Sequence, residues 1–504
     1  MKFVAKTVLV FFLVSCAMHD SMNLDNEKTN FVFSFSEKFT GFENNNTYQW
    51  LGIPYAQAPV KSLRWKAPRP LQDQEKKIKA LKFGNPCPQT ESVSIDKKGN
   101  GLYVGSEDCL FLNVFTPKNI NQEKNLPVMF WIHGGGNTSG ESGSYDFSKL
   151  ATAHNLVIVT INYRLGFLGW FYHPSFAATS NNLEDRSGNF GTLDQIMALK
   201  WVQQNIEDFG GDKNNVTIFG ESAGGHNVFA LLSSPLAKNL FHKAISQSGA
   251  TDTFNLNEAS KFFDNNENSL LTSSKEVVSR LLVNEKTSKD LFVANIAQES
   301  MNEFKLLEQM QAVGLDEIFK IYENLQNSNQ DGKKMIPRVL SDGHVLPKRG
   351  IQFSDKNFYN DVPVIFGTNR DETKLFSAME SDYSTSFLNR IVIIRNQEMY
   401  DLTAEYASNN WKISAVDNPA RDMTSSGKKN VFAYRFDWDE QGKLLWMDLS
   451  KIFGAAHAME IPFVTGTMKL LGIERFMFNK ENLPDAIRLS IAMQSYWAEF
   501  AYTG

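Results

Sequence analysis

The feature that most limits how this 504-residue chain can fold is a glycine-rich turn around a serine, GESAGG at Gly220–Gly225. The turn directly follows an apolar run, Val216–Phe219, and directly precedes a helical pattern, Val228–Leu232. To present a serine hydroxyl above a sheet, the backbone must pass from strand to helix at one strained residue, and side chains on the flanking glycines would collide with the backbone. In this setting the G-x-S-x-G pattern predicts that Ser222 is an exposed nucleophile.

A second glycine-rich segment, HGGG at His133–Gly136, follows the apolar run Leu126–Ile132. Nucleophilic attack on a carbonyl carbon places negative charge on the carbonyl oxygen, and preorganised N–H groups stabilise that charge. One such donor is worth about 10²- to 10³-fold in rate. We therefore predict an oxyanion hole formed by the backbone N–H groups of Gly135, Gly136 and Ala223, the residue after the nucleophile.

A serine nucleophile also needs a carboxylate and a histidine, which follow the serine in that order in folds with this turn. The apolar run Val362–Phe366 leads into GTNRDET, which contains Asp371 and Glu372, and His457 lies further on in GAAHAMEIPF. Spacing does not choose between Asp371 and Glu372, and it leaves Asp342 in SDGH as a third candidate. An imidazole of ordinary pKa, about 6.5, predicts activity that rises through mildly acidic pH toward neutral.

Apolar runs alternate with helical patterns, which predicts an α/β fold with a mostly parallel, doubly wound central sheet and helical insertions. Most runs lack polar alternation, as expected for strands covered by helices on both faces. Apolar residues recur at helical spacing over Leu193–Ile206, with Thr192 and Gln195 as a predicted capping box. A helical cap insertion is expected at about 251–334. The core strand candidates are Leu126–Ile132, Leu156–Ile161, Val216–Phe219, Ala244–Ser246, Val362–Phe366 and Val431–Phe436.

Composition excludes some classes of function. The chain is 42% hydrophobic and 12% aromatic, which is enough for a large core, and its formal net charge is only -5. Lys and Arg form no stripe, so there is no electrostatic reason to expect a nucleic-acid partner. The three cysteines and eight histidines show no metal-ligand spacing, and neither a metal site nor a cofactor is expected.

The N-terminal segment has the features of an export signal, a basic start followed by a short apolar run, Val8–Val14. We predict a signal peptide at 1–16 that ends in LVSC, a lipobox in which Cys16 becomes acylated; ordinary cleavage nearby is the alternative. Residues 17–30 would form a polar tether, and 31–504 a single domain. The protein is thus expected in the bacterial cell envelope if lipid-anchored, and otherwise in the periplasm or secreted.

Longer segments spread over roughly 48–504 match one family. They are LGIPYAQAP, SEDCLFLNV, WIHGGG, NYRLGFLG, GNFGTLDQ, FGGDKNNVTIFGESAGG, SQSGA, GTNRDE, HAMEIPF and FAYTG. On these segments the sequence resembles the type-B carboxylesterases, the cholinesterase-like branch of the α/β-hydrolases. The resemblance implies the α/β-hydrolase fold and a serine carboxylesterase that hydrolyses small-molecule carboxylic esters through an acyl-enzyme.

The resemblance also implies roles for individual residues. In this family the second carboxylate of the DE pair is the triad acid, which selects Glu372 and leaves Asp371 as a supporting residue. The histidine of the H-x-x-E-x-P-F segment is the general base, which matches His457. The cysteine of EDCL pairs with one about twenty residues earlier, which matches Cys109 and Cys87; an oxidising compartment favours the same disulfide.

Other positions support or depart from the family pattern. Ser248 matches a position that usually supports the triad, and Glu221 beside the nucleophile is either a supporting carboxylate or merely structural. The loop between the two cysteines has only Tyr103 as an aromatic residue, so a choline cage is not expected. Thr373 and Thr465 stand where the family usually has Gly and Phe, and the end at FAYTG suggests an incomplete product.

Two rival functions differ from small-ester hydrolysis. The first is lipase action on long-chain glycerides, which interfacial activation would reveal. The second is a non-catalytic binding module, since cholinesterase-like domains also serve as adhesion proteins that typically lack the nucleophile or the histidine. The presence of Ser222, Glu372 and His457 favours the enzyme. The sequence does not specify the physiological ester or the oligomeric state.

Overall fold

The computed structural model describes the chain in several stretches: residues 32–33, 38–72, 77–90, 103–121, 125–264, 270, 272–328, 338–378, 382–387, 391–444, 446–470 and 474–504. The predicted signal peptide, Cys16 with its lipobox and the polar tether lie outside these residues. Within the described stretches, no helix combines the length and the apolar character needed to cross a membrane.

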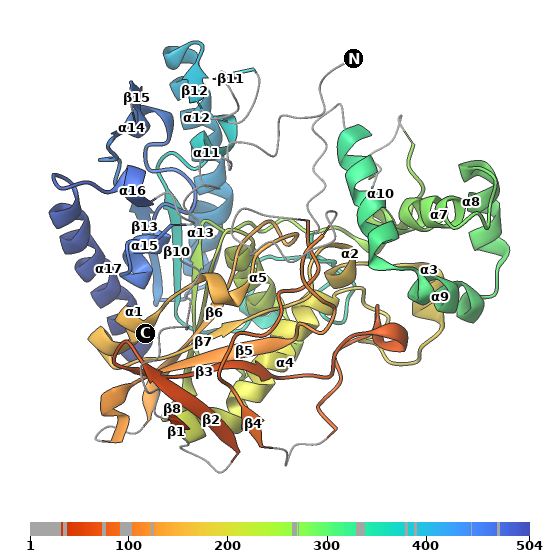
Figure 1. The fold of residues 1–504 in the computed structure, drawn as a ribbon, viewed down its shortest axis with the longest axis horizontal. Helices are drawn as coiled ribbons and strands as arrows, with labels where there is room; N and C mark the ends of the chain where they lie inside the picture. Colours follow the sequence, from red (N-terminus) through yellow and green to blue (C-terminus); the bar gives the residue numbers. More distant parts are fainter. Residues whose placement is uncertain are drawn as a thin grey trace.

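A large twisted sheet runs through the molecule (Figure 1). Its strands are β1 (Val32–Phe33), β2 (Phe39–Asn44), β3 (Thr47–Pro54), β4 (Ile78–Lys79), β5 (Phe111–Pro117), β6 (Leu126–Ile132), β7 (Val157–Ile161), β8 (Gly211–Glu221), β9 (Lys243–Gln247), β10 (Val364–Asn369) and β13 (Val431–Phe436). They follow the order β1-β2-β3-β5-β7-β6-β8-β9-β10-β13, with β4 paired to β2. Neighbours from β7 to β13 are parallel, and those from β1 to β7 are antiparallel. This order confirms the predicted mostly parallel, doubly wound sheet.

Two small antiparallel sheets lie apart from the central one, β11 (Ser384–Phe387) with β12 (Ile391–Ile394), and β14 (Lys443–Leu444) with β15 (Met447–Asp448). The helices are α1 (Ser148–His154), α2 (Gly166–Gly169), α3 (Pro174–Ala178), α4 (Phe190–Asn205), α5 (Ala223–Ser233), α6 (Leu256–Ser260), α7 (Ser274–Asn284), α8 (Leu291–Ser300), α9 (Glu303–Ala312), α10 (Leu315–Ser328), α11 (Lys374–Ser377), α12 (Gln397–Lys412), α13 (Asn418–Ser425), α14 (Leu449–Ile452), α15 (Ile461–Thr465), α16 (Glu474–Met477) and α17 (Leu483–Thr503).

Helices cover both faces of the sheet, with α4 and α5 on one side and α1 and α17 on the other (Figure 1). Every residue of β6 is buried, because successive strand side chains point to opposite faces and both faces are covered. Val128, Phe130 and Ile132 lie in a core shared with α4 and α5. Met129 and Trp131 lie in a second core shared with α1 and α17.

The registers of the parallel strands bring the predicted motifs to one edge of the sheet. Ile132, the last residue of β6, lies opposite Gly220 in β8, and Gly220 lies opposite Ser246 in β9. Ser246 in turn lies opposite Phe366 in β10. Because parallel strands end at the same edge, the segments that follow β6, β8 and β10 meet there, which is where α/β sheets place their sites.

The observed helix before β8 differs from the predicted one. Helix α4 begins at Phe190 rather than at Leu193, so the predicted capping box is wrong. Thr192 lies inside the helix, buried, and its hydroxyl oxygen accepts a hydrogen bond from Trp170 Nε1 (3.2 Å) instead of capping. Gly210, with φ 82°, ends the short 3₁₀ segment Ile206–Phe209 that follows α4.

The region at 251–334 contains helices α6 to α10 among its described residues, and α7 to α10 gather at one end of the molecule (Figure 1). A disulfide joins Cys87 and Cys109 in the structure, with an S–S distance of 2.02 Å. Between these cysteines, Tyr103 stacks on Phe319 of α10, with ring centroids 5.0 Å apart. The loop closed by the disulfide therefore contacts the helical region rather than standing free.

Candidate active site

Ser222 lies in a sharp turn between β8 and α5. Its backbone has φ 59° and ψ -122°, a strained conformation for a residue with a side chain. A Cβ at Gly220 would lie 2.6 Å from the carbonyl oxygen of Ile132, and one at Gly224 would collide with the same oxygen. The turn thus requires both glycines, and it leaves Ser222 half-buried at the start of a helix, whose positive end favours developing negative charge.

The HGGG segment passes directly beside this turn. A Cβ at Gly134 would lie only 3.1 Å from Ser222 Cβ. Gly135 and Gly136 both have positive φ, 99° and 63°, so the segment can curl around the serine. In the described part of the chain, the backbone N–H groups of Gly135, Gly136 and Ala223 donate to no other residue. These donors are therefore available to an oxygen bound next to Ser222.

His133 belongs to the framework of this segment. Its Nδ1–H donates to the carbonyl oxygen of Gly134 (2.8 Å), and its ring stacks on Tyr163 with centroids 4.4 Å apart. The hydroxyl of Tyr163 donates to the carbonyl oxygen of His133 (2.5 Å). Burial lowers the pKa of His133 to about 4, so this imidazole is neutral and acts as a packed support rather than a base.

Glu372 and His457 form a close buried pair. His457 Nδ1 and Glu372 Oε2 are 2.6 Å apart, and the two side chains are 5% and 0% exposed. The other oxygen of Glu372 accepts the N–H of Asn369 (2.7 Å) and the hydroxyl of Thr368 (2.9 Å). Burial raises the pKa of Glu372, but His457 and these hydrogen bonds, with a contribution from Ser248, outweigh burial and lower it. Glu372 is thus a carboxylate that can orient the imidazole.

The two other candidate acids have different neighbours. Asp371 turns its carboxylate away from the imidazole and accepts the N–H of Ala455 (3.0 Å). Asp342 accepts backbone N–H groups within its own turn, those of Val345 and Leu346 among them (both 3.0 Å). Of the three carboxylates left open by spacing, only Glu372 contacts the histidine.

The second ring nitrogen of His457 faces Glu221, not Ser222. His457 Nε2 lies 3.3 Å from Glu221 Oε1, and neither atom makes a well-formed hydrogen bond in the described structure. No hydrogen bond joins His457 to Ser222 within the described residues. The structure therefore brings Glu372 and His457 together. It does not bring His457 into contact with Ser222; the imidazole instead faces Glu221, the residue directly before Ser222.

Three buried carboxylates set the charge of this imidazole. Burial lowers the pKa of His457, but Glu221, Glu372 and Glu460 outweigh that effect and raise it to about 9. The pKa of Glu221 is raised to about 8, mainly by burial. Attraction to His457 lowers this pKa, whereas repulsion from Glu460 and Glu372 raises it further. Because these groups lie close together, their titrations are linked rather than independent.

Several contributors were not identified from the sequence. Glu460 is 0% exposed and accepts from Asn369 Nδ2 (2.7 Å) and Gln247 Nε2 (3.2 Å). Its spacing from His457, H-x-x-E, is the signal that could have revealed it. The rings of Phe376 and Trp411 pack on the imidazole, with centroids 5.3 Å and 4.9 Å away. Nothing in the local sequence predicts these aromatic contacts, because both helices reach the site through tertiary packing.

Among the side chains that the structure describes, no group of three or more His, Cys, Asp or Glu residues could hold a metal ion.

Comparisons with known proteins show the family to which the chain belongs. The Carboxylesterase family model matches residues 36–416. Para-nitrobenzyl esterase of Bacillus subtilis (strain 168) is 34% identical over 481 residues, which cover 93% of this chain and 88% of that protein. Carboxylesterase 1D of Rattus norvegicus is 37% identical over 334 residues, which cover 64% of this chain and 54% of the rat protein. The chain therefore aligns with about half the length of the mammalian relative.

Solved structures show the same relationship. A PNB esterase structure has a TM-score of 0.70 at 31% identity and covers 92% of this chain and 89% of that chain. The carboxylesterase of Geobacillus stearothermophilus has a TM-score of 0.65 at 26% identity and covers 93% of this chain and 90% of that chain. Together with the strand order and the turn that carries Ser222, these matches establish that the chain belongs to the carboxylesterase family and is a carboxylic ester hydrolase with the α/β-hydrolase fold.

Proposed function

We propose that this carboxylesterase acts through Ser222 as nucleophile, His457 as general base and Glu372 as the triad acid. The observation that carries the proposal is the buried 2.6 Å pair of Glu372 and His457, whose imidazole faces the residue next to Ser222. A histidine held in one orientation by a carboxylate, beside a serine in a strained strand-to-helix turn, is the arrangement that activates a hydroxyl as a nucleophile.

The proposed cycle has two halves that use the same imidazole. Neutral His457 takes the Ser222 proton through Nε2 as the serine oxygen attacks the ester carbonyl, and the N–H groups of Gly135, Gly136 and Ala223 stabilise the oxyanion. The C–O bond then breaks, and the imidazolium protonates the departing alcohol. A water activated by His457 hydrolyses the acyl-enzyme.

The serine–histidine contact must close during this cycle. His457 Nε2 lies 3.3 Å from Glu221 Oε1, so the imidazole has to move to bring this nitrogen to the serine oxygen. Such hydrogen bonds are often long in an empty site and tighten when substrate binds. We propose that Glu372 keeps the ring in its tautomer throughout, while Glu221 contributes negative charge that stabilises the imidazolium.

We propose small esters with an apolar or aromatic part as the substrate class. Phe376 is 39% exposed, and with Trp411 it forms an aromatic wall beside the imidazole, which suits an aryl or short acyl group. The Bacillus subtilis relative is named for its action on para-nitrobenzyl esters. The direct test is turnover of p-nitrobenzyl and p-nitrophenyl esters of increasing acyl length, together with mapping of the adduct formed by a serine-reactive organophosphonate.

The pH dependence of hydrolysis tests the environment of the base. His457 must be neutral to accept a proton, and its pKa is raised to about 9, so kcat/KM should rise as pH increases through that range. This midpoint lies above the one that an ordinary imidazole predicts. Glu221→Gln removes a carboxylate whose charge raises the pKa of His457, and the midpoint should move toward acid by about one pH unit or more.

The control for this prediction is the pH profile of wild-type protein measured in the same buffers, with stability checked at each pH. A Glu221→Gln midpoint that stays in place, or that moves toward alkali, would contradict the role of Glu221 in charging His457. The comparison uses an isosteric change, so the turn that presents Ser222 keeps its shape.

For the location of the protein we propose export followed by acylation at Cys16. The Cys87–Cys109 disulfide supports export, because disulfides are typical of oxidising compartments. The acyl chains would anchor the protein, at ~0.8 kcal/mol per buried CH₂. In a bacterial host, wild-type protein should partition with membranes and incorporate labelled palmitate, whereas Cys16→Ala should lose the label. Wild-type protein that is unlabelled and freely soluble outside the cytoplasm would indicate an ordinary signal peptide.

A further inference from the structure

Two loops that carry the candidate acid and base are joined through Asp371. The acid loop, residues 369–374, follows β10, and the histidine loop, residues 453–457, follows α14. The N–H of Asp371 donates to the carbonyl oxygen of Ala455 (2.9 Å), and the N–H of Ala455 donates back to Asp371 Oδ2 (3.0 Å). Ala455 lies two residues before His457, so this reciprocal pair fixes the backbone that leads into the base.

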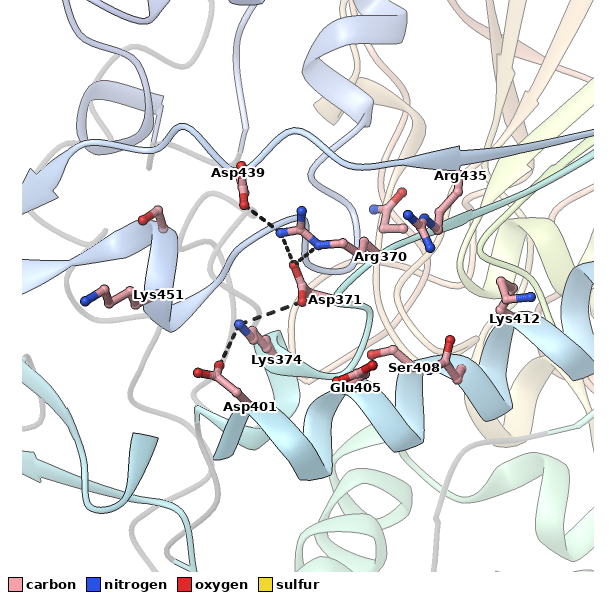
Figure 2. A pocket seen from close by; sticks show the side chains of 13 residues that line it. Arg370, Asp371, Lys374, Asp401, Glu405, Ser408, Lys412, Arg435, Asp439 and Lys451 are labelled. Atoms are coloured by element: carbon pink, nitrogen blue, oxygen red, sulfur yellow. Dashed lines mark hydrogen bonds and ion pairs between the residues drawn. The ribbon is translucent and has the colours of Figure 1, made fainter. Parts of the chain in front are cut away.

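The carboxylate of Asp371 is held in place from its other side by two cations. Arg370 donates to Asp371 Oδ2 through Nε (3.0 Å) and Nη2 (2.7 Å), and Lys374 Nζ lies 3.7 Å from Asp371 Oδ1. Arg370 also forms an ion pair with Asp439 (2.7 Å). Lys374 forms one with Asp401 (2.8 Å), and Figure 2 shows both pairs. Charge-assisted hydrogen bonds of this kind are stronger than neutral ones and restrict the side chain to one orientation.

The fit between Asp371 and the histidine loop is tight. Asp371 is 9% exposed. Gly454 has φ 54°, and a Cβ added there would overlap Asp371 Oδ2, so the carboxylate occupies the space that a side chain would need. The contact therefore leaves the histidine loop little freedom to shift relative to the acid loop.

A charged cavity of about 420 Å³ opens onto this contact (Figure 2). Its lining includes Arg370, Asp371 and Lys374 together with Arg435 of β13, and it includes none of Ser222, Glu372 or His457. Arg435 pairs with Asp437, and in Figure 2 no dashed line joins it to the ion pairs around Asp371. The cavity thus gives small solutes access to the back of the acid loop without passing over the nucleophile.

We propose that Asp371 is a positioning residue. Through the backbone of Ala455 it holds His457 in the position from which the imidazole can serve Glu372 and Ser222. Arg370 and Lys374 keep the carboxylate of Asp371 oriented toward that backbone. The proposal rests on the triad assigned above. Displacement of a general base by about 1 Å can cost about 10²-fold in rate. Ester binding needs no contact with the back of the loop, so loss of Asp371 should lower kcat and leave KM nearly unchanged.

The first test compares Asp371→Asn with Arg435→Gln, two charge-removing changes at the same cavity. Asp371→Asn should lower kcat by about 10- to 100-fold with KM within about 3-fold of wild type. The side chain of Arg435 pairs with Asp437 and makes no hydrogen bond or ion pair with either loop in the described structure, so Arg435→Gln should keep wild-type kcat and KM. The folded fraction of each variant is checked by thermal unfolding and by the endpoint of organophosphonate labelling. Tyr400 should help the variants fold, since its hydroxyl lies 2.9 Å from the carbonyl oxygen of Lys374 in the acid loop and 2.7 Å from that of Ile452, directly before the histidine loop.

The second test is chemical rescue of Asp371→Ala by formate. A small carboxylate entering the cavity can pair with Arg370 and Lys374 and accept the N–H of Ala455, so formate should raise kcat of this variant at least about 5-fold. Sodium chloride at the same concentration should not, and wild type should not respond to formate. A rescue of this kind separates positioning of the base from a general loss of structure, which a solute would not reverse.

The outcomes separate this proposal from the triad assignment. If wild type hydrolyses esters and Ser222→Ala does not, but folded Asp371→Asn keeps kcat within about 2-fold, the positioning role is overturned and the triad stands. A loss of kcat in Asp371→Ala that formate leaves unchanged would overturn it too. If wild type itself fails to turn over any ester in the panel, the proposed function is what fails.

Discussion

Replacing Ser222 with alanine should lower kcat for p-nitrophenyl esters by about 10⁴- to 10⁶-fold, the range found when a triad nucleophile is removed. The reason is that only the serine oxygen can form the acyl-enzyme, and neither a Thr nor a Cys lies beside it in GESAGG. The fold should survive, because the alanine keeps the Cβ that the strained turn already accommodates. Steady-state kinetics and thermal unfolding of both proteins provide the measurement.

The same variant provides the control for covalent labelling. A serine-reactive organophosphonate should form one adduct with wild type, on the peptide that contains Ser222, and none with Ser222→Ala. An adduct mapped to another residue, or an alanine variant with near-wild-type turnover, would show that a different group is the nucleophile. Fragment-ion mapping of the digested protein distinguishes these results.

Replacing Glu372 with glutamine should lower kcat by about 10³- to 10⁴-fold, a loss typical of removing the triad acid. Glutamine keeps the size of the side chain but loses the charge that stabilises the imidazolium, and its amide favours the wrong tautomer of His457. The buried pair offers no water to compensate, since Glu372 is 0% exposed. Thr368 and Asn369 would still hold the remaining oxygen, so the loop should keep its shape.

The matched comparison for this prediction is Asp371→Asn, one residue earlier in the same loop. Its expected loss is smaller, about 10- to 100-fold, because Asp371 acts on His457 only through the backbone of Ala455. Equal losses, or a larger loss in Asp371→Asn, would contradict the assignment of Glu372 as the acid. Both variants are measured at several pH values, so that a shifted pKa of His457 is not mistaken for a lost contact.

The turn around the nucleophile and the strands of the sheet were predictable from the sequence, because they depend on residues that are close together in the chain. The turn around Ser222 needs glycines on both sides because side chains there would strike the carbonyl oxygen of Ile132, and a pattern of a few residues carries that requirement. The sheet was predictable for a similar reason, since strands covered on both faces are continuously apolar, as β6 is. The start of α4 was misjudged because the threonine of the apparent capping pattern accepts a hydrogen bond from Trp170 instead.

The choice between Asp371 and Glu372 could not come from spacing, because the two are adjacent and point in different directions from the end of β10. Only the resemblance to a family separated them before the structure did so by contact. Glu372 meets His457, whereas Asp371 meets Ala455 and the charged cavity. Which way each side chain points is decided by the packing of the loop against a segment more than eighty residues away.

The sequence alone thus determined the fold class, the glycine-lined turn around the nucleophile and the set of residues from which a triad could be drawn, because those depend on short-range sterics and periodicity. Tertiary structure decided the electrostatics. It buried Glu221, Glu372 and Glu460 around one imidazole and so raised the pKa of His457 to about 9. It also places Nε2 of His457 next to Glu221, and it joins the acid loop to the histidine loop through the hydrogen bond between Asp371 and Ala455. Desolvation and charge–charge distances of this kind arise only when segments distant in the chain pack together.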